Sequence, residues 1–90
     1  MNLAVIGSGG REHAICYKLK QSPKTKKIIC IPGNAGTQKI AENIKEDISN
    51  FEALYQIIRN KNVDLVIVGQ EPPLVDGLVE FLLLLLHTLR

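Results

Sequence analysis

The stretch LAVIGSGGREHA, from Leu3 to Ala14, decides the fold of this chain. Its first four residues are continuously apolar and include β-branched side chains, which is typical of a short strand buried on both faces of a sheet. Gly7, Gly9 and Gly10 follow, and a helical pattern begins directly after them. A strand, a glycine-rich turn and a helix form the first half of a parallel βαβ unit, and the positive end of such a helix can hold a phosphate group.

Strand and helix patterns alternate along the rest of the chain. Apolar runs closed by glycine or proline predict buried strands over 2–7, 27–31 and 62–69. After the second strand we expect one turn of helix and then a short strand near Ile44. Helical spacing returns over 71–83, behind two prolines that a first helical turn tolerates. This order predicts an α/β fold, a Rossmann-like parallel sheet with flanking helices and right-handed crossovers.

Two amphipathic helices are predicted between these strands, over 10–21 and 49–60. The first ends before a Ser-Pro pair, because proline disfavours helical geometry in the preceding residue. In the second, Ser49 and Glu52 have the spacing of a capping box. The predicted apolar stripes consist of Ala14, Ile15 and Leu19 in the first helix, and of Phe51, Leu54, Tyr55 and Ile58 in the second.

Composition excludes several classes of protein. The excess of 11 basic over 9 acidic side chains is too small to indicate a nucleic-acid partner, and the Lys24–Lys27 cluster is interpreted as a solvated turn. Cys16 and Cys30 lack the spacing of a zinc site and are expected to be small buried thiols in a reducing compartment. Neither a signal peptide nor the about 20 apolar residues of a membrane span is recognisable. We therefore expect a cytoplasmic protein without a nucleic-acid or membrane partner.

A glycine-rich turn of this kind can hold the phosphate of a dinucleotide, of a nucleoside triphosphate or of a smaller molecule. A dinucleotide fingerprint needs a third glycine where this chain has Glu12, and an acid after the second strand, where it has Pro-Gly-Asn at 32–34. The GxxxxGK[ST] loop of nucleoside triphosphate sites is absent. A smaller anion remains, held by the backbone N–H groups of residues 8–10 and by the Arg11 guanidinium. The alternative is that the glycines only permit a tight turn and that Arg11 is a surface charge.

Parallel sheets bind their ligands outside the carboxyl ends of the strands. The loops that leave those ends here are 7–11, 32–37 and 69–73. We expect them to converge. Glu71 is placed to accept hydrogen bonds from sugar hydroxyls, or else to complement a helix dipole. Asn34 and Thr37 are either ligand contacts or turn formers, and His13 is not expected to be a catalyst.

Three motifs in this order, VIGSGGREHA, PGNAGT and VGQEPPLVDGLVE, closely resemble the N-terminal domain of the phosphoribosylamine–glycine ligase family (the glycinamide ribonucleotide synthetases) of the ATP-grasp superfamily. The resemblance covers about 1–80, which is therefore expected to be a Rossmann-like pre-ATP-grasp domain. It implies a ligase that joins glycine to 5-phosphoribosylamine in de novo purine (IMP) synthesis. ATP is hydrolysed to ADP and phosphate with Mg²⁺, through phosphorylation of the glycine carboxylate and attack by the amine.

The resemblance also implies which residues contact the substrate. Gly9, Gly10 and Arg11 would hold the phosphate of phosphoribosylamine and Glu71 its ribose. Asn34 and Gly36 would complete the pocket wall. Gln70 and Pro72 replace the proline and alanine that usually flank the family's glutamate, which leaves Glu71 itself in place.

The family binds ATP, Mg²⁺ and glycine in domains that follow this one, so neither a catalytic residue nor a metal ligand is expected in this chain. We expect the 90 residues alone to be inactive as a ligase, with the sheet incomplete at its C-terminal end. The alternative function is a stand-alone Rossmann-like nucleotide-binding module without catalysis. The blandest alternative is a fragment that binds nothing.

The last ten residues, FLLLLLHTLR at 81–90, depart from the resemblance. Five consecutive leucines leave no polar face on a helical turn. We expect an atypical leucine-rich tail of a truncated, frameshifted or cut chain, and self-association through its apolar surface.

Overall fold

The computed structural model describes residues 1–69. The expected helix over 71–83, Glu71 and the leucine-rich tail lie outside these residues. The described chain forms a four-stranded sheet in the order β3-β2-β1-β4, and every pair of neighbouring strands is parallel. This confirms the predicted α/β class with its parallel sheet. The strands are β1 (Asn2–Gly7), β2 (Lys27–Pro32), β3 (Glu42–Asn43) and β4 (Leu65–Val68).

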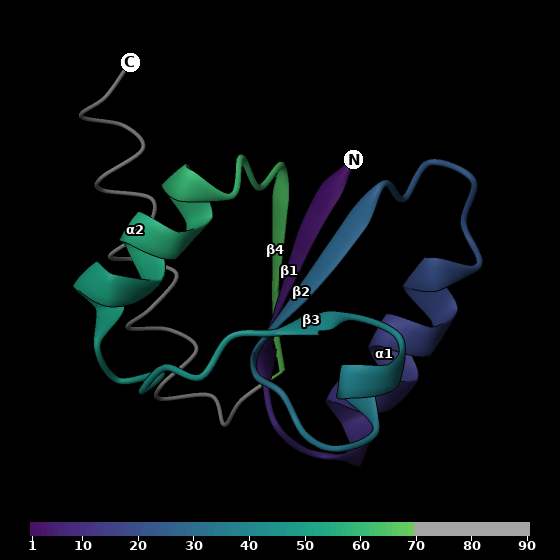
Figure 1. Ribbon diagram of the computed structural model, residues 1–90, viewed down its shortest axis with the longest axis horizontal. Coiled ribbons are helices and arrows are strands. Elements are labelled where there is room, and N and C mark those ends of the chain that lie inside the picture. Colours follow the sequence, from purple (N-terminus) through teal and green to yellow (C-terminus); the bar gives the residue numbers. More distant parts are fainter. Residues whose placement is uncertain (70–90) are drawn as a thin grey trace.

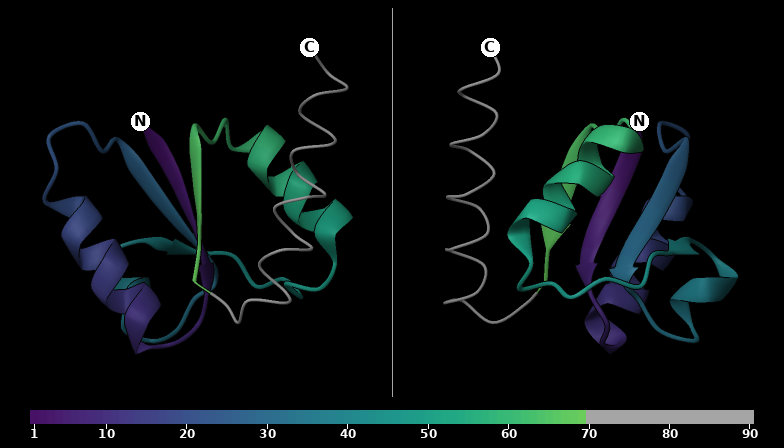
Figure 2. Two further views of the ribbon diagram at one scale, coloured as in Figure 1. Left: turned by 180° about the vertical axis from the view of Figure 1, so that it is seen from behind. Right: turned by 60° about the vertical axis from the view of Figure 1, so that its left-hand side comes forward.

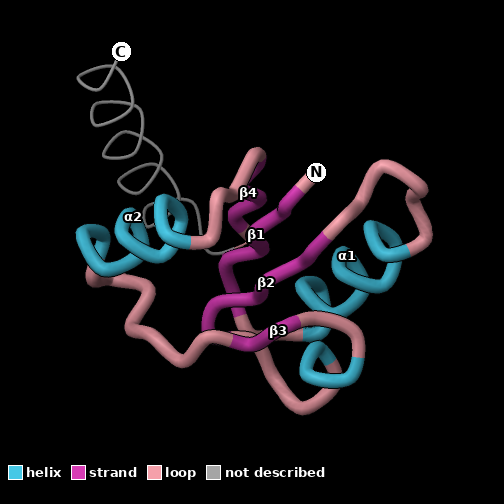
Figure 3. Tube along the Cα trace, turned by 45° about the horizontal axis from the view of Figure 1, so that its top comes forward, coloured by secondary structure: helices cyan, strands magenta, loops and turns pink. Residues whose placement is uncertain are grey.

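Helix α1 (Gly10–Lys20) and helix α2 (Phe51–Asn60) pack on opposite faces of the sheet (Figures 1 and 2). A short 3-10 turn, η1 (Thr37–Lys39), precedes β3, as expected for this part of the chain. Figure 3 shows the same three layers with the top of the molecule tilted toward the viewer and the strands between the two helices. Within residues 1–69, no helix combines the length and the apolar character that crossing a membrane requires.

The core lies mainly between the sheet and α2. Alternate residues of a strand point to opposite faces, so Ala4 and Ile6 of β1 pack beneath α2. Leu54 and Tyr55 of α2 complete this cluster, and Phe51 and Ile58 pack against it. The predicted apolar stripe of the second helix is thus confirmed.

On the other face, the apolar stripe predicted for the first helix is wrong in one residue. Ala14 is exposed, whereas Cys16 is fully buried against Val5 and Cys30. Ile15 and Leu19 are half-buried and pack against the same cluster. The helix is rotated relative to the predicted stripe because Glu12 and Cys16, one turn apart, face the sheet.

The start of α2 also differs from the prediction. Asn50, not Ser49, is the N-cap, and its side-chain oxygen accepts a hydrogen bond from the Ala53 N–H at 3.1 Å. Ser49 is instead bonded to Asp47, with its hydroxyl 2.7 Å from Oδ1. Because Asn50 takes the capping position one residue later, the capping box predicted for Ser49 and Glu52 does not form.

We expect replacement of Leu54 by alanine to lower the free energy of unfolding by about 2–5 kcal/mol, because the side chain is fully buried between α2 and the sheet. Urea denaturation followed by circular dichroism measures the change. Gln56→Ala, at an exposed position of the same helix, is the matched control and should change the value by less than about 0.5 kcal/mol. Equal effects of the two substitutions would contradict this packing.

Candidate functional site

The loops that follow β1, β2 and β4 meet at one edge of the sheet, at the bottom of Figure 1. The Gly33 N–H donates to the Gly7 carbonyl at 3.0 Å, and the Gly69 N–H donates to the Ile6 carbonyl at 3.0 Å. The expected convergence is therefore confirmed for the described parts of the three loops. Glu71 follows Gly69 by two residues and lies outside the described chain.

Asn34 joins the loop after β2 to the glycine-rich loop after β1. Its Nδ2 donates to the carbonyl oxygens of Ser8, at 2.8 Å, and Gly9, at 3.1 Å. Its Oδ1 accepts the Thr37 N–H at 2.9 Å. Both ends of the amide are thus occupied within the protein. Of the two interpretations of Asn34, the structure supports the turn former, which also fastens one wall of the site to the other.

Thr37 and Asn43 hold this second loop from beneath. Thr37 is fully buried, and its hydroxyl accepts the Asn34 N–H at 2.7 Å and lies 2.7 Å from Asn43 Oδ1. Asn43 Nδ2 in turn donates to the Asn34 carbonyl at 2.8 Å. Thr37 is therefore a turn former as well. Asn43 was missed from the sequence, because its partners come from residues 34–37 and only the position of β3 brings them together.

The glycine-rich loop already uses one of its amides. The Gly9 N–H donates to Glu12 Oε2 at 3.1 Å, and the Glu12 side chain is only 4% exposed. Gly10 and Arg11 are the first two residues of α1, where backbone N–H groups have no acceptor within the helix. These two amides, rather than that of Gly9, are the donors that this helix start offers to an anion.

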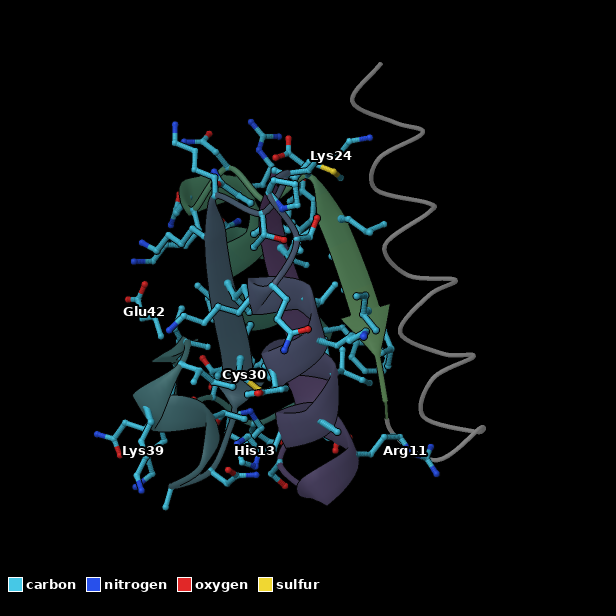
Figure 4. All side chains as sticks on the ribbon, turned by 90° about the vertical axis from the view of Figure 1, so that its right-hand side faces the viewer. Arg11, His13, Lys24, Cys30, Lys39 and Glu42 are labelled. Carbon is cyan, nitrogen blue, oxygen red and sulfur yellow. The ribbon has the colours of Figure 1, made fainter. Side chains whose placement is uncertain are left out.

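The side chains of the first turn of α1 point in different directions (Figure 4). Arg11 is exposed at the carboxyl edge of the sheet, where its guanidinium can add donors beside the helix start. His13 is also exposed and lies against the loop after β2, because a Cβ on Gly36 would fall 2.8 Å from its Nδ1. Gly36 therefore lies beside His13, and its lack of a side chain leaves room for the imidazole.

The two cysteines lie directly beneath the loops and are buried free thiols, as predicted. Cys30 Sγ is 3.6 Å from the Gly7 carbonyl. The hydrogen bond to Cys30 raises the pKa of Cys16, and burial raises it further. Cys16 therefore stays protonated at neutral pH. Residues 1–69 contain no group of three or more His, Cys, Asp or Glu side chains that could hold a metal ion.

Most of the chain matches a known protein family and curated members of it. The family model described as "Phosphoribosylglycinamide synthetase, N domain" matches residues 1–88. The chain is similar to a phosphoribosylamine–glycine ligase of Rhodopirellula baltica, with 48% identity over 81 residues that cover 90% of this chain and 18% of the relative. The corresponding ligase of a Nostoc species is 42% identical over 84 residues, which are 91% of this chain and 20% of the relative. The chain thus spans about a fifth of the length of the curated relatives that it matches.

We expect Asn34→Asp to destabilise the protein by about 1–3 kcal/mol, because a carboxylate oxygen would replace the Nδ2 donor and face the carbonyls of Ser8 and Gly9. Thermal and urea unfolding measure the loss, and the amide resonances of the glycine-rich loop should shift with it.

Asn50→Asp is the matched control for this substitution. The Asn50 side chain only accepts a hydrogen bond in its capping role, and aspartate is an equally good N-cap. Its effect should stay within about 0.5 kcal/mol. A stability loss in Asn34→Asp no larger than that in Asn50→Asp would show that the bridge between the loops does not contribute.

Proposed function

This chain belongs to the phosphoribosylglycinamide synthetase N-domain family, and we propose that it is the N-terminal part of a ligase joining glycine to 5-phosphoribosylamine. The observation that carries the proposal is the family match over residues 1–88, together with relatives of 42–48% identity that are named phosphoribosylamine–glycine ligase. The reaction hydrolyses ATP to ADP and phosphate and belongs to de novo purine synthesis in the cytoplasm. The active ligase would consist of this domain together with the parts of the related enzymes that the chain does not span.

Within that reaction, the chain binds and orients the phosphate end of phosphoribosylamine. The positive end of α1 points to the carboxyl edge of the sheet, and the Gly10 and Arg11 N–H groups start that helix. The exposed Arg11 guanidinium supplies a planar pair of donors suited to a phosphate. Gly9 and Gly36 shape the wall, and Asn34 keeps the two loops together. Glu71 accepts hydrogen bonds from the ribose hydroxyls.

Residues 1–69 lack one common ATP-binding motif and a metal-ligand cluster. They contain neither a triphosphate-binding loop of the GxxxxGK[ST] type nor a group of side chains suited to a metal ion. In keeping with the family resemblance, we assign ATP, Mg²⁺ and glycine to the parts of such ligases that these residues do not span. Those parts supply the activated glycine carboxylate, and this chain holds the amine that attacks it. Correct placement of the amine is the contribution of this domain to the rate.

We expect the chain to bind ribose 5-phosphate in preference to NAD and ATP. Arg11→Ala and Glu71→Gln should each weaken this binding about tenfold, because each removes hydrogen bonds to a charged or hydroxyl-bearing part of the ligand. Isothermal titration calorimetry measures the affinities. Lys18→Ala, an exposed cation in the last turn of α1, and Glu52→Gln, an exposed acid of α2, are the matched controls. Tight NAD binding that is insensitive to Glu71→Gln would instead support the stand-alone nucleotide-binding module.

The 90 residues by themselves should form no glycinamide ribonucleotide from ATP, glycine and phosphoribosylamine, because they span about a fifth of the related ligases. Chromatography of the reaction products with radiolabelled glycine measures this. A complete relative assayed in parallel shows that the assay works. ATP-dependent product formation by the purified chain would refute the proposed division of roles.

A further inference from the structure

Glu12 carries a buried carboxylate to which the proposed function gives no task. It is the third residue of α1 and stands where a dinucleotide-binding loop has its third glycine. We propose that Glu12 is a positioning residue whose carboxylate locks the glycine-rich loop to the end of β4. This inference rests on the proposed function for its consequence, because the lock would fix the phosphate-binding loop relative to the segment that leads to Glu71.

The first half of the lock is the hydrogen bond from the Gly9 N–H to Glu12 Oε2, at 3.1 Å. It closes the turn between β1 and α1 on itself. The carboxylate also sits in the first turn of α1, where the helix dipole favours a negative charge. With the Gly9 amide engaged, the loop presents the first two amides of α1 outward. The Gly9 amide is then not free for a ligand, whereas the amides of Gly10 and Arg11 and the Arg11 guanidinium remain available.

The second half is a cradle formed by two glycines on neighbouring strands. Ile6 of β1 pairs with Val68 of β4, so the residues that follow them, Gly7 and Gly69, lie side by side. A Cβ on Gly7 would overlap Glu12 Oε1, and a Cβ on Gly69 would lie 2.6 Å from the same oxygen. In both cases the Cβ and the carboxylate oxygen would be closer than the van der Waals radii of carbon and oxygen allow. The carboxylate therefore fills the space that the two glycines leave across the ends of β1 and β4.

The contact with Gly69 matters because Glu71 is only two residues further along. Gly69 is the last described residue before it, so the Glu12 contact lies at the start of the segment that carries the proposed ribose ligand. The same Glu12 side chain touches the loop proposed to hold the phosphate and the strand end that leads to the proposed ribose ligand. A shift of either loop is transmitted to the other through this carboxylate.

An ordinary capping interaction would account for the Gly9 hydrogen bond but not for the cradle at Gly69. The two roles are separable by experiment. Glu12→Asp keeps the charge but is one methylene shorter, so its carboxylate is withdrawn from both Gly9 and Gly69. Glu12→Gln keeps the reach and one carbonyl acceptor but loses the charge. Glu12→Ala removes both, and Glu52→Gln is the control for loss of an exposed negative charge.

Hydrogen exchange of individual amides, followed by NMR, tests the lock in the 90-residue chain. We expect Glu12→Ala and Glu12→Asp to speed exchange of the Gly9 and Gly69 amides together by about tenfold, with Glu12→Gln close to wild type. Acceleration at Gly9 alone would reduce Glu12 to a helix cap and overturn the lock. Equal acceleration at all core amides would indicate a general loss of stability and would overturn it too. Should Glu12→Ala fail to fold, the aspartate and glutamine variants decide between these outcomes.

Ligand affinities then test the consequence of the lock. Inorganic phosphate would bind through the glycine-rich loop alone. Ribose 5-phosphate would contact both that loop and Glu71, so its binding depends on how the two are placed relative to each other. Glu12→Asp should therefore weaken the binding of ribose 5-phosphate about tenfold more than the binding of inorganic phosphate. In Glu12→Gln the ratio of the two affinities should be close to that of the wild type. Equal weakening of both ligands would overturn the coupling. A wild-type chain that binds neither ligand would refute the proposed function, and the exchange rates would still decide whether Glu12 locks the two strand ends together.

Discussion

Strand β1 is hydrogen-bonded along both of its edges, to β2 on one side and to β4 on the other, and the remaining elements take their places from it. A strand with two neighbours and two covered faces must be apolar throughout, and residues 3–6 are fully buried and apolar. Because all three strands run in parallel, their carboxyl ends come to one edge. The pairing of the strands therefore brings the loops that carry polar residues to the same edge.

At that edge, side chains complete what the backbone pairing begins. The Asn34 amide bridges the loops after β1 and β2, while Thr37 and Asn43 support it from below. On the other side of β1, the Glu12 carboxylate occupies the space between the ends of β1 and β4. The Asn34, Thr37 and Asn43 side chains are hydrogen-bonded within the protein, and one oxygen of Glu12 accepts the Gly9 N–H. The first amides of α1 and the Arg11 guanidinium remain directed outward.

This division explains why a loop that looks like part of a dinucleotide site serves a different ligand in the proposed function. In a dinucleotide-binding protein the third glycine lets the helix approach the strand closely. Here the glycines lie on the strand ends, at Gly7 and Gly69, and the side chain lies on the helix, at Glu12. The helix and the strand ends are therefore still in close contact, but the glycines are on the strands and the side chain is on the helix. The Glu12 carboxylate also accepts the Gly9 N–H, which a bound pyrophosphate would otherwise use.

The sequence by itself determined the elements and their order. Local apolar runs, glycines and prolines were sufficient to predict the four strands, both helices and the short turn before β3, because these signals act within a few residues. Tertiary structure decided which faces and partners those elements use. Ala14 is exposed and Cys16 buried because the sheet, not the helix, selects the packed face. Asn43 reaches its partners at 34 and 37 only because β3 pairs with β2, and Glu12 meets Gly69 only because β4 pairs with β1. A local sequence pattern carries no information on such strand pairing.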